Sequence, residues 1–114
     1  MSSHIKAVHD RLVFRELARA SLRARSGPIR VHFVAPLESD GCVAVAYSVS
    51  RGIGNAVVRN RCRRRMRAIV VRVAEELPAG AYLVSVGGEV VGLDFAELEQ
   101  RLVEAMRNAS RSKR

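Results

Sequence analysis

The pattern of apolar and polar positions predicts a chain of alternating helices and strands. Apolar residues recur at three- and four-residue spacings over 9–25, which indicates a first helix with Phe14 on or beside its apolar side. Ser26-Gly27-Pro28 then predicts its end. Alternation over 29–35 predicts a strand covered on one face. The valine-rich stretch 42–50 predicts a second strand, antiparallel to the first because their connection is short.

The second half of the sequence predicts a long helix, a further strand and a closing helix. Placed on a helical wheel, 56–77 gathers its apolar side chains on an arc of roughly 120°. Residues 81–86 predict a strand that lies parallel to a neighbour, because a helix precedes it. Asp94 can cap the last helix together with Glu97. The expected apolar face of that helix consists of Phe95, Leu98, Leu102 and Met106.

This element order predicts an α+β fold with two layers, a small central sheet packed by three helices. The order is helix, two or three strands, helix, strand and helix. A length of 114 residues fits one domain over 1–114. Residues 1–9 and 108–114 are expected to be flexible ends, the second of them basic.

Composition limits the class of protein. Hydrophobic residues make up 48% of the chain, enough for a packed core. No apolar run approaches the ~18–20 residues that cross a membrane, and the first ten residues lack the pattern of a secretory signal. Cys42 and Cys62 are too few for a disulfide framework or a zinc site, and are expected to be buried thiols. We therefore expect a cytoplasmic protein that is independent of membranes.

Positive charge is concentrated in one segment. The formal net charge is +9, and residues 51–72 hold eight arginines and no acidic residue, which supplies +8 of it. Guanidinium groups bind phosphate through paired hydrogen bonds and stack on bases, so this segment favours nucleic acid. On the helical wheel, one flank carries Asn60, Arg63, Arg64 and Arg67; the other carries Arg61, Arg65 and Arg72, and Arg59 lies within the apolar arc in the first turn.

The segment from Ser48 to Arg67 resembles the signature of the bacterial ribonuclease P protein component. It combines Ser-Val-Ser at 48–50, Gly-Asn-Ala-Val at 54–57 and Arg-Asn-Arg at 59–61, followed by a basic pair at 63–64 and a further arginine. These positions match the family's spacing without a gap, and the order of elements matches over nearly the whole chain. A pattern of about twenty positions is far more specific than a basic patch.

This resemblance implies a ribosomal-protein-like fold with a left-handed crossover. It also implies the protein subunit of an endoribonuclease, which helps remove the 5′ leader of precursor tRNA while the catalytic RNA performs the chemistry with Mg²⁺. The partners would be that RNA and the leader, with no obligate protein partner. The residues implied to bind RNA are Arg51, Asn55, Arg59, Asn60, Arg61, Arg63, Arg64 and Arg67. Those implied to line the leader cleft are Phe14, Phe33, Ser48 and Ser50.

The sequence departs from the family pattern at two positions. The family usually places two basic residues after Ser-Val-Ser, and here the second is Gly52. The family's second aromatic residue on the first helix is also missing, since Ala18 lies one turn after Phe14. We therefore expect leader binding to be weaker or differently placed, whereas binding of the RNA subunit depends mainly on the intact helix motif.

Several of these residues have a simpler interpretation. An arginine-rich flank is often only a solvated helix face, and Arg65 and Arg72 lie off the family pattern, so we expect them to be solvated charges. Phe33 shares a strand face with Ile29 and Val31, so a core position fits it as well as the cleft. Phe95 is expected in the core.

No catalytic site of the protein itself is visible in the sequence. It offers no histidine pair for acid–base cleavage of RNA and no carboxylate cluster for metal ions beyond Glu38 and Asp40 in an expected turn. We therefore expect no catalytic and no metal-binding residues. Two other classes stay open. One is a ribosomal or RNA-chaperone protein of the same fold, and the other is a DNA-binding regulator, which should be a dimer.

Overall fold

The computed structural model describes residues 5–7, 15, 19, 22–34 and 42–111. Most of the expected first helix lies outside these residues, as do Phe14 and the expected turn with Glu38 and Asp40. Within that helix, Arg15 and Arg19 are helical and exposed.

Five strands form a single mixed sheet. In chain order they are β1 (Ile5–Ala7), β2 (Arg23–Ser26), β3 (Ile29–Val34), β4 (Val43–Val49) and β5 (Gly80–Val86). Across the sheet the order is β1-β4-β5-β3-β2. Strand β4 runs parallel to β1 and β5, whereas β3 runs antiparallel to β5 and β2.

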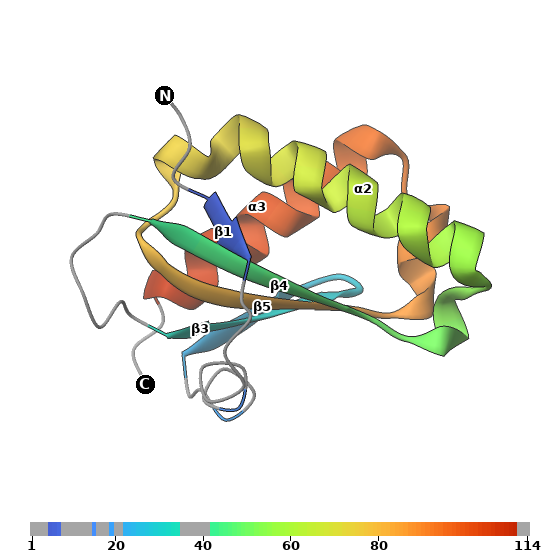
Figure 1. The fold of residues 1–114 in the computed structure, drawn as a ribbon, viewed down its shortest axis with the longest axis horizontal. Coiled ribbons are helices and arrows are strands. Elements are labelled where there is room, and N and C mark those ends of the chain that lie inside the picture. The colour runs from blue at the N-terminus through green and yellow to red at the C-terminus, as the bar shows by residue number, and fades with distance from the viewer. Residues whose placement is uncertain (1–4, 8–14, 16–18, 20–21, 35–41, 112–114) are drawn as a thin grey trace.

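Two long helices cover one face of this sheet, α2 (Ala56–Val73) and α3 (Phe95–Arg111) (Figure 1). The prediction of a two-layer α+β fold is therefore confirmed. The parallel pairing of β5 with β4 across the α2 crossover is confirmed as well. The hand of that crossover stays a prediction.

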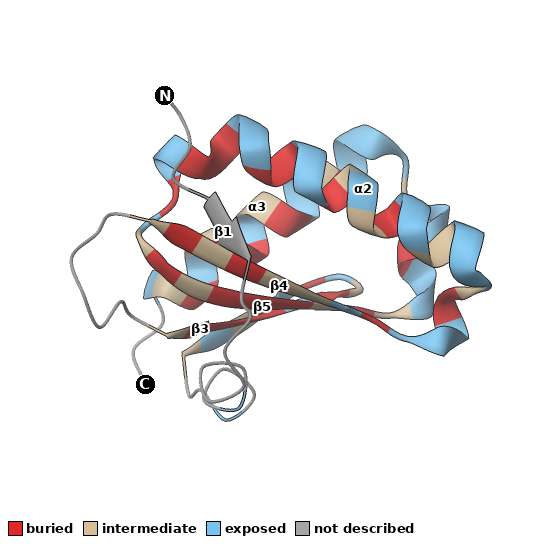
Figure 2. Cartoon of the chain, viewed as in Figure 1, coloured by how far each residue is buried: buried red, intermediate tan, exposed pale blue. Residues whose placement is uncertain are grey.

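The core lies between the helices and one face of the sheet. Figure 2 shows buried residues as alternating positions along the strands and as a stripe along each helix. The central strands and the helices contribute the largest fully buried side chains, among them Ile29, Val31, Tyr82, Val84, Met66, Ile69, Leu98, Leu102 and Met106. Burial of each such side chain stabilises the fold by about 1.5–3 kcal/mol.

The first helix, predicted over 9–25, ends earlier than expected, because residues 23–26 form β2. Ser26 pairs with Ile29 across a two-residue turn in which Gly27 has a φ of 59°, a conformation that glycine adopts at no steric cost. Arg23 and Arg25 alternate with Ala24 and Ser26, which is the period of a strand. With only one strongly apolar neighbour, Leu22, that alternation is too short to stand out in the sequence.

Strand β4 runs antiparallel to β3, as the sequence predicts, but the two strands are not neighbours. Strand β5 lies between them and pairs with both. The helix α2 returns the chain beside β4, and β5 buries Tyr82 and Val84 on the same face as β3 and β4. A connection that is short in sequence therefore does not make these strands neighbours.

Parts of both segments that were expected to be flexible belong to regular elements. Residues 5–7 form β1 instead of a loose segment. Helix α3 extends to Arg111, so 108–111 are helical, and Ala109 of this last turn is fully buried.

The last helix begins as the sequence predicts. The backbone N–H of Glu97 donates to Asp94 Oδ1 at 2.8 Å, and the N–H of Asp94 donates back to Glu97 Oε1 at 3.3 Å. Leu98, Leu102 and Met106 are buried, but Phe95 is 37% exposed, so its predicted core position is wrong. The expected end of the long helix at 77 is replaced by a 3-10 turn over Ala74–Glu76.

Candidate nucleic-acid interface

The basic segment begins with a tight connection between β4 and α2. Ser50 follows β4, and Arg51–Ile53 form a 3-10 turn that buries Ile53. Asn55 then caps α2, since its Oδ1 accepts a hydrogen bond from the backbone N–H of Val58 at 3.0 Å. The turn leaves Arg51 exposed beside the positive end of the helix dipole, which favours anions.

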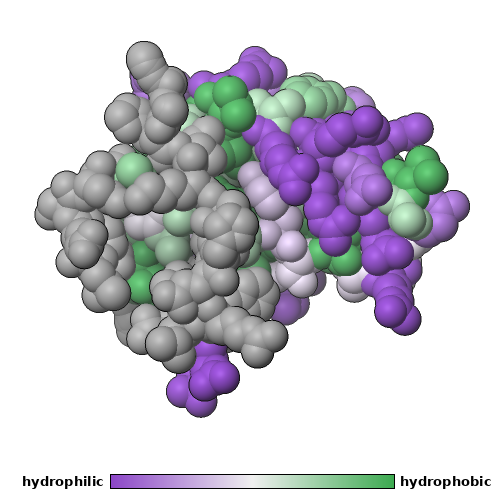
Figure 3. Space-filling model, viewed as in Figure 1, coloured by the Kyte–Doolittle hydropathy of each residue, from purple (hydrophilic) through white to green (hydrophobic). Residues whose placement is uncertain are grey.

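One flank of α2 is a shallow basic groove. It is lined by Val57, Asn60, Arg63, Arg64 and Arg67, as the helical wheel predicts. Arg63 donates from Nη1 to Asn60 Oδ1 at 3.2 Å, which holds its guanidinium along the groove. In Figure 3, strongly hydrophilic side chains form a band over the region of α2. We call these five residues the basic groove.

Tyr47 on β4 supports the end of the basic groove. The guanidinium carbon of Arg67 lies 5.9 Å from the centre of the Tyr47 ring, in cation–π range. Burial raises the pKa of Tyr47 to about 12, so its hydroxyl stays protonated and leaves the positive charge of Arg67 uncompensated.

The other flank of α2 faces α3. Arg65 donates from Nη2 to the carbonyl oxygen of Leu93 at 3.2 Å and lies 5.9 Å from the ring centre of Phe95. Arg72 pairs with Glu99 at 3.2 Å. The expectation of a solvated charge is therefore wrong for Arg65. Arg72 is solvated as expected, with 59% of its side chain exposed, but the docking of α3 also gives it Glu99 as a partner that the sequence does not reveal.

The arginines of the basic groove have no carboxylate partner among the described residues. In that part of the chain, every acidic residue lies between 75 and 104, and the ion pairs involve Arg72 and Arg107. Arg61 is exposed, and Arg59 is half-buried, with an Nε that has no hydrogen-bond partner within the described ranges. These side chains therefore present uncompensated positive charge.

The expected leader-cleft residues separate into two groups. Ser48 and Ser50 are both exposed at the end of β4 that leads into α2. Phe33 is only 5% exposed, and its ring centre lies 4.8 Å from that of Tyr82 in the core. The assignment of Phe33 to the cleft is therefore wrong. Phe14 lies outside the described residues.

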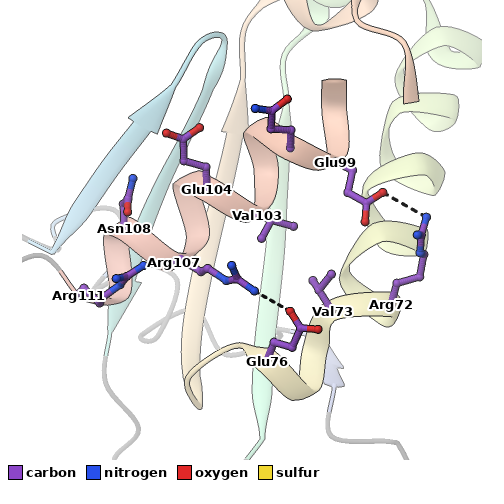
Figure 4. A pocket seen from close by; sticks show the side chains of 10 residues that line it. Arg72, Val73, Glu76, Glu99, Val103, Glu104, Arg107, Asn108 and Arg111 are labelled. Carbon is purple, nitrogen blue, oxygen red and sulfur yellow. Dashed lines mark hydrogen bonds and ion pairs between the residues drawn. The ribbon is translucent and has the colours of Figure 1, made fainter. Parts of the chain in front are cut away.

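A second hollow lies between the end of α2 and α3 (Figure 4). Glu76 pairs with Arg107 at 2.6 Å across it, and Arg72 pairs with Glu99. Its charges compensate each other, so this hollow stabilises the contact of the two helices and does not attract a polyanion.

The described residues bring no group of three His, Cys, Asp or Glu side chains together for a metal ion. Mg²⁺ prefers oxygen ligands such as carboxylates, and the residues that line the basic groove include none. Within the same residues, no helix is long and apolar enough to cross a membrane.

Comparison of the sequence with known protein families identifies the family of this chain. The model of the family described as Ribonuclease P matches residues 4–110. The chain belongs to this family. Its ribonuclease P relatives include a ribonuclease P protein component of a Nocardioides species, 36% identical over 86 residues, which covers 74% of this chain and 73% of the relative. The ribonuclease P protein component of Brevibacillus brevis is 36% identical over 80 residues, which covers 69% of this chain and 64% of the relative.

Solved ribonuclease P proteins share the fold. That of Thermotoga maritima has a TM-score of 0.79 at 18% identity, covering 96% of this chain and 99% of that one. A Staphylococcus aureus RNase P protein mutant has a TM-score of 0.82 at 18% identity, and the match covers 91% of this chain and 87% of the mutant. The described architecture is therefore that of ribonuclease P proteins.

Proposed function

We propose that this chain binds the catalytic RNA of ribonuclease P through α2 and the 5′ leader of precursor tRNA beside it. It thereby assists the endonucleolytic removal of the leader. The observation that carries this proposal is the basic groove, whose arginines have no carboxylate partner among the described residues. Arg51, Arg59 and Arg61 extend the same charge toward the start of the helix.

A rigid helix suits the recognition of folded RNA. The side chains of α2 are held in a fixed register by the buried stripe of Cys62, Met66 and Ile69 below them. Phosphates of a folded RNA are likewise fixed in space, so neither backbone has to be ordered on binding. Each phosphate that is neutralised releases counterions and steepens the dependence of affinity on salt.

The leader would bind where β4 leads into α2. The hydroxyls of Ser48 and Ser50 are exposed there and can donate to sugar or phosphate oxygens. Phe14 remains the candidate for stacking on a base, a contact worth about 1–3 kcal/mol. Phe33 supports this surface from the core and does not touch the leader.

We propose that the RNA subunit performs the chemistry of cleavage. We also propose that the holoenzyme works in the cytoplasm. Two-metal cleavage of a phosphodiester needs a cluster of oxygen ligands, and the described residues offer no such cluster. We propose that the holoenzyme uses Mg²⁺ through its RNA and that the arginines of this chain lower the repulsion between RNA and substrate.

Reconstitution tests the proposal. The full chain is mixed with a ribonuclease P RNA and a precursor tRNA at low Mg²⁺, and the rate of correct 5′ cleavage is compared with that of the RNA alone. We expect clear stimulation. The double variant Arg63→Gln/Arg67→Gln should lose most of it, whereas Arg72→Gln/Arg111→Gln removes the same charge elsewhere and should keep it. No stimulation by the unaltered chain would leave only an RNA-binding protein.

A further inference from the structure

The side chain of Phe95 is the most exposed aromatic side chain among the described residues. Phe95 opens α3 and is 37% exposed, whereas Phe33 and Tyr82 are buried and Tyr47 is half-buried. It lies on the same face of the helix as Leu98, which is buried in the core. The apolar face of α3 therefore continues past the core at its first residue, where the ring is open to solvent.

An arginine of α2 lies against this ring. The guanidinium carbon of Arg65 is 5.9 Å from the centre of the Phe95 ring, and Arg65 Nη2 donates to the carbonyl oxygen of Leu93 at 3.2 Å. Figure 1 shows the connection from β5 to α3 passing beside the first half of α2, which brings these residues together. The guanidinium is therefore held in place beside an exposed aromatic ring.

The positive charge of Arg65 is uncompensated. A guanidinium has five N–H donors, and the hydrogen bond to the β5–α3 connection uses one of them. Arg65 has no carboxylate partner among the described residues. The two carboxylates at the start of α3, those of Asp94 and Glu97, accept hydrogen bonds from each other's backbone N–H. By contrast Arg72, farther along the same flank of α2, pairs with Glu99.

Arg61 extends this positive charge along the flank. It is exposed and lies one turn before Arg65, about 6 Å away along the helix axis. It has no carboxylate partner in the described ranges either. We call Arg61, Arg65 and Phe95 the Phe95 site. The site adjoins the basic groove, because Arg61 directly follows Asn60 in α2.

The composition of the Phe95 site fits a nucleotide better than an apolar protein surface. An apolar partner would cover the ring, but it would also remove water from the remaining donors of Arg65 without replacing it, which costs free energy. An unpaired nucleotide meets both requirements. Its base has a π-face that stacks on an aromatic ring, and its phosphate oxygens accept hydrogen bonds from guanidiniums.

We propose that the Phe95 site is a second contact for the catalytic RNA, separate from the basic groove. An unpaired base stacks on the exposed part of Phe95, and Arg61 and Arg65 bind the phosphates next to it. The identity of this RNA rests on the proposed function. RNA that is bound on two flanks of α2 fixes the rotation of the helix about its own axis, which contact on one flank alone does not.

Variants of Phe95 test the stacked base. The full chain is prepared unaltered, with Phe95→Leu, which keeps apolar volume but loses the ring, and with Phe95→Tyr, which keeps the ring. Val71→Ala is the control, because it removes another exposed apolar side chain, 66% exposed near the end of α2. Affinity for the catalytic RNA is measured over a range of salt concentrations, and thermal unfolding checks that each variant is folded.

We expect Phe95→Leu to bind the RNA about tenfold more weakly at every salt concentration, because a stacked base adds affinity without releasing counterions. Its log–log salt slope should match that of the unaltered chain. Phe95→Tyr and Val71→Ala should bind as the unaltered chain does. Equal affinity of Phe95→Leu and Phe95→Tyr, or a loss of affinity that comes with a lower slope, would overturn the stacked base.

The charge of the Phe95 site is tested on Arg65. Arg65→Gln should weaken binding several-fold and lower the salt slope by about 0.7–0.9, the effect of one phosphate. Arg72→Gln removes the same charge from the same flank, but Arg72 is paired with Glu99, so the slope should not change. Identical slopes for the two variants would mean that Arg65 does not bind phosphate.

A crosslink locates the RNA directly. A photoreactive benzophenone side chain in place of Phe95 should crosslink to an unpaired nucleotide of the catalytic RNA, and the same group in place of Val71 should not. No crosslink at position 95, or one to a base-paired nucleotide, would refute the site. The proposed function is judged separately, on the stimulation of cleavage by the unaltered chain. If that fails, Phe95→Leu and Phe95→Tyr are compared on a hairpin RNA with an unpaired loop, where equal affinity would also refute the site.

Discussion

Asn55 Oδ1 accepts a hydrogen bond from the backbone N–H of Val58 at 3.0 Å, and this hydrogen bond fixes where α2 begins. The helix carries its arginines at fixed angular positions relative to that first turn. Asn55, which matches the family pattern, therefore has a structural role as a helix cap, independent of any contact with RNA.

Replacing this cap should weaken the fold locally. We expect Asn55→Ala to lower the free energy of unfolding by about 1 kcal/mol, because a backbone N–H of the first turn loses its partner. Asn55→Asp keeps an acceptor and should retain stability, while its negative charge should reduce RNA affinity. Denaturant unfolding and RNA binding measured on both variants separate the two roles. Equal stability of Asn55→Ala and the unaltered chain would contradict the capping role.

The two flanks of α2 should differ in their response to salt. Arg63→Ala and Arg67→Ala lie in the basic groove, so each should weaken RNA binding and lower the log–log salt slope by about 0.7–0.9 for each phosphate that is no longer neutralised. Arg72→Ala is the matched control, because Arg72 already forms an ion pair with Glu99. Affinity is measured over a range of salt concentrations. Identical slopes for all three variants would mean that the groove does not touch phosphate.

Phe33 should behave as a core residue. It is 5% exposed, and a Cβ added at Gly80 would lie 2.5 Å from its ring, so the sheet is built closely around it. We expect Phe33→Ala to destabilise the protein by about 3–5 kcal/mol. Phe33→Leu keeps much of the apolar burial, and the folded variant should bind precursor tRNA normally. Thermal unfolding and substrate binding test both points; a stable Phe33→Leu protein that binds the leader poorly would restore the cleft assignment.

Lowering the pH should remove a contribution of His32 to stability. Its pKa in the folded chain lies below the ordinary value of 6.5, because burial and the charges of Arg23 and Arg30 disfavour the imidazolium. The unfolded chain therefore binds the proton more readily. The contribution is complete above about pH 7 and is lost as pH falls through 6.5 toward the lower folded value. The unfolding free energy of the unaltered chain should fall relative to that of His32→Leu as the pH decreases over that interval. A constant difference would contradict the shift.

The elements that the sequence predicts well are those set by local chemistry. The start of α3 follows from Asp94 and Glu97, three residues apart, and the basic groove follows from the helical period from Asn60 onward. Such features depend on neighbours within one or two turns. They can therefore be derived without knowing the rest of the fold.

Features that depend on distant partners could not be derived. The helical period places Arg63 and Arg65 on different flanks of α2, but only the docking of α3 gives Arg65 its contact with Leu93. The pairing of β5 with β3 decides that Phe33 packs on Tyr82 and that Arg30 lies beside Ser85. Register between strands far apart in the sequence is not a local property.

Gly52 offers a test in which affinity should rise. Its φ is not positive, and a Cβ built there meets only Ser50 Oγ at 3.7 Å, an ordinary contact, so the backbone accepts a side chain. The exposed position lies directly after Arg51, beside the start of α2. We expect Gly52→Lys to neutralise one more phosphate, steepening the salt slope by about 0.7–0.9 and tightening RNA binding several-fold at low salt.

Gly52→Ala is the matched control for the backbone. Both substitutions restrict the unfolded chain and should stabilise the protein equally, by about 0.4–1 kcal/mol. Only the lysine should alter RNA affinity, since only it brings charge. Binding and unfolding are measured on both variants. If alanine raised the affinity as much as lysine, the gain would come from a stiffer turn, and the added charge at this position would have no part in it.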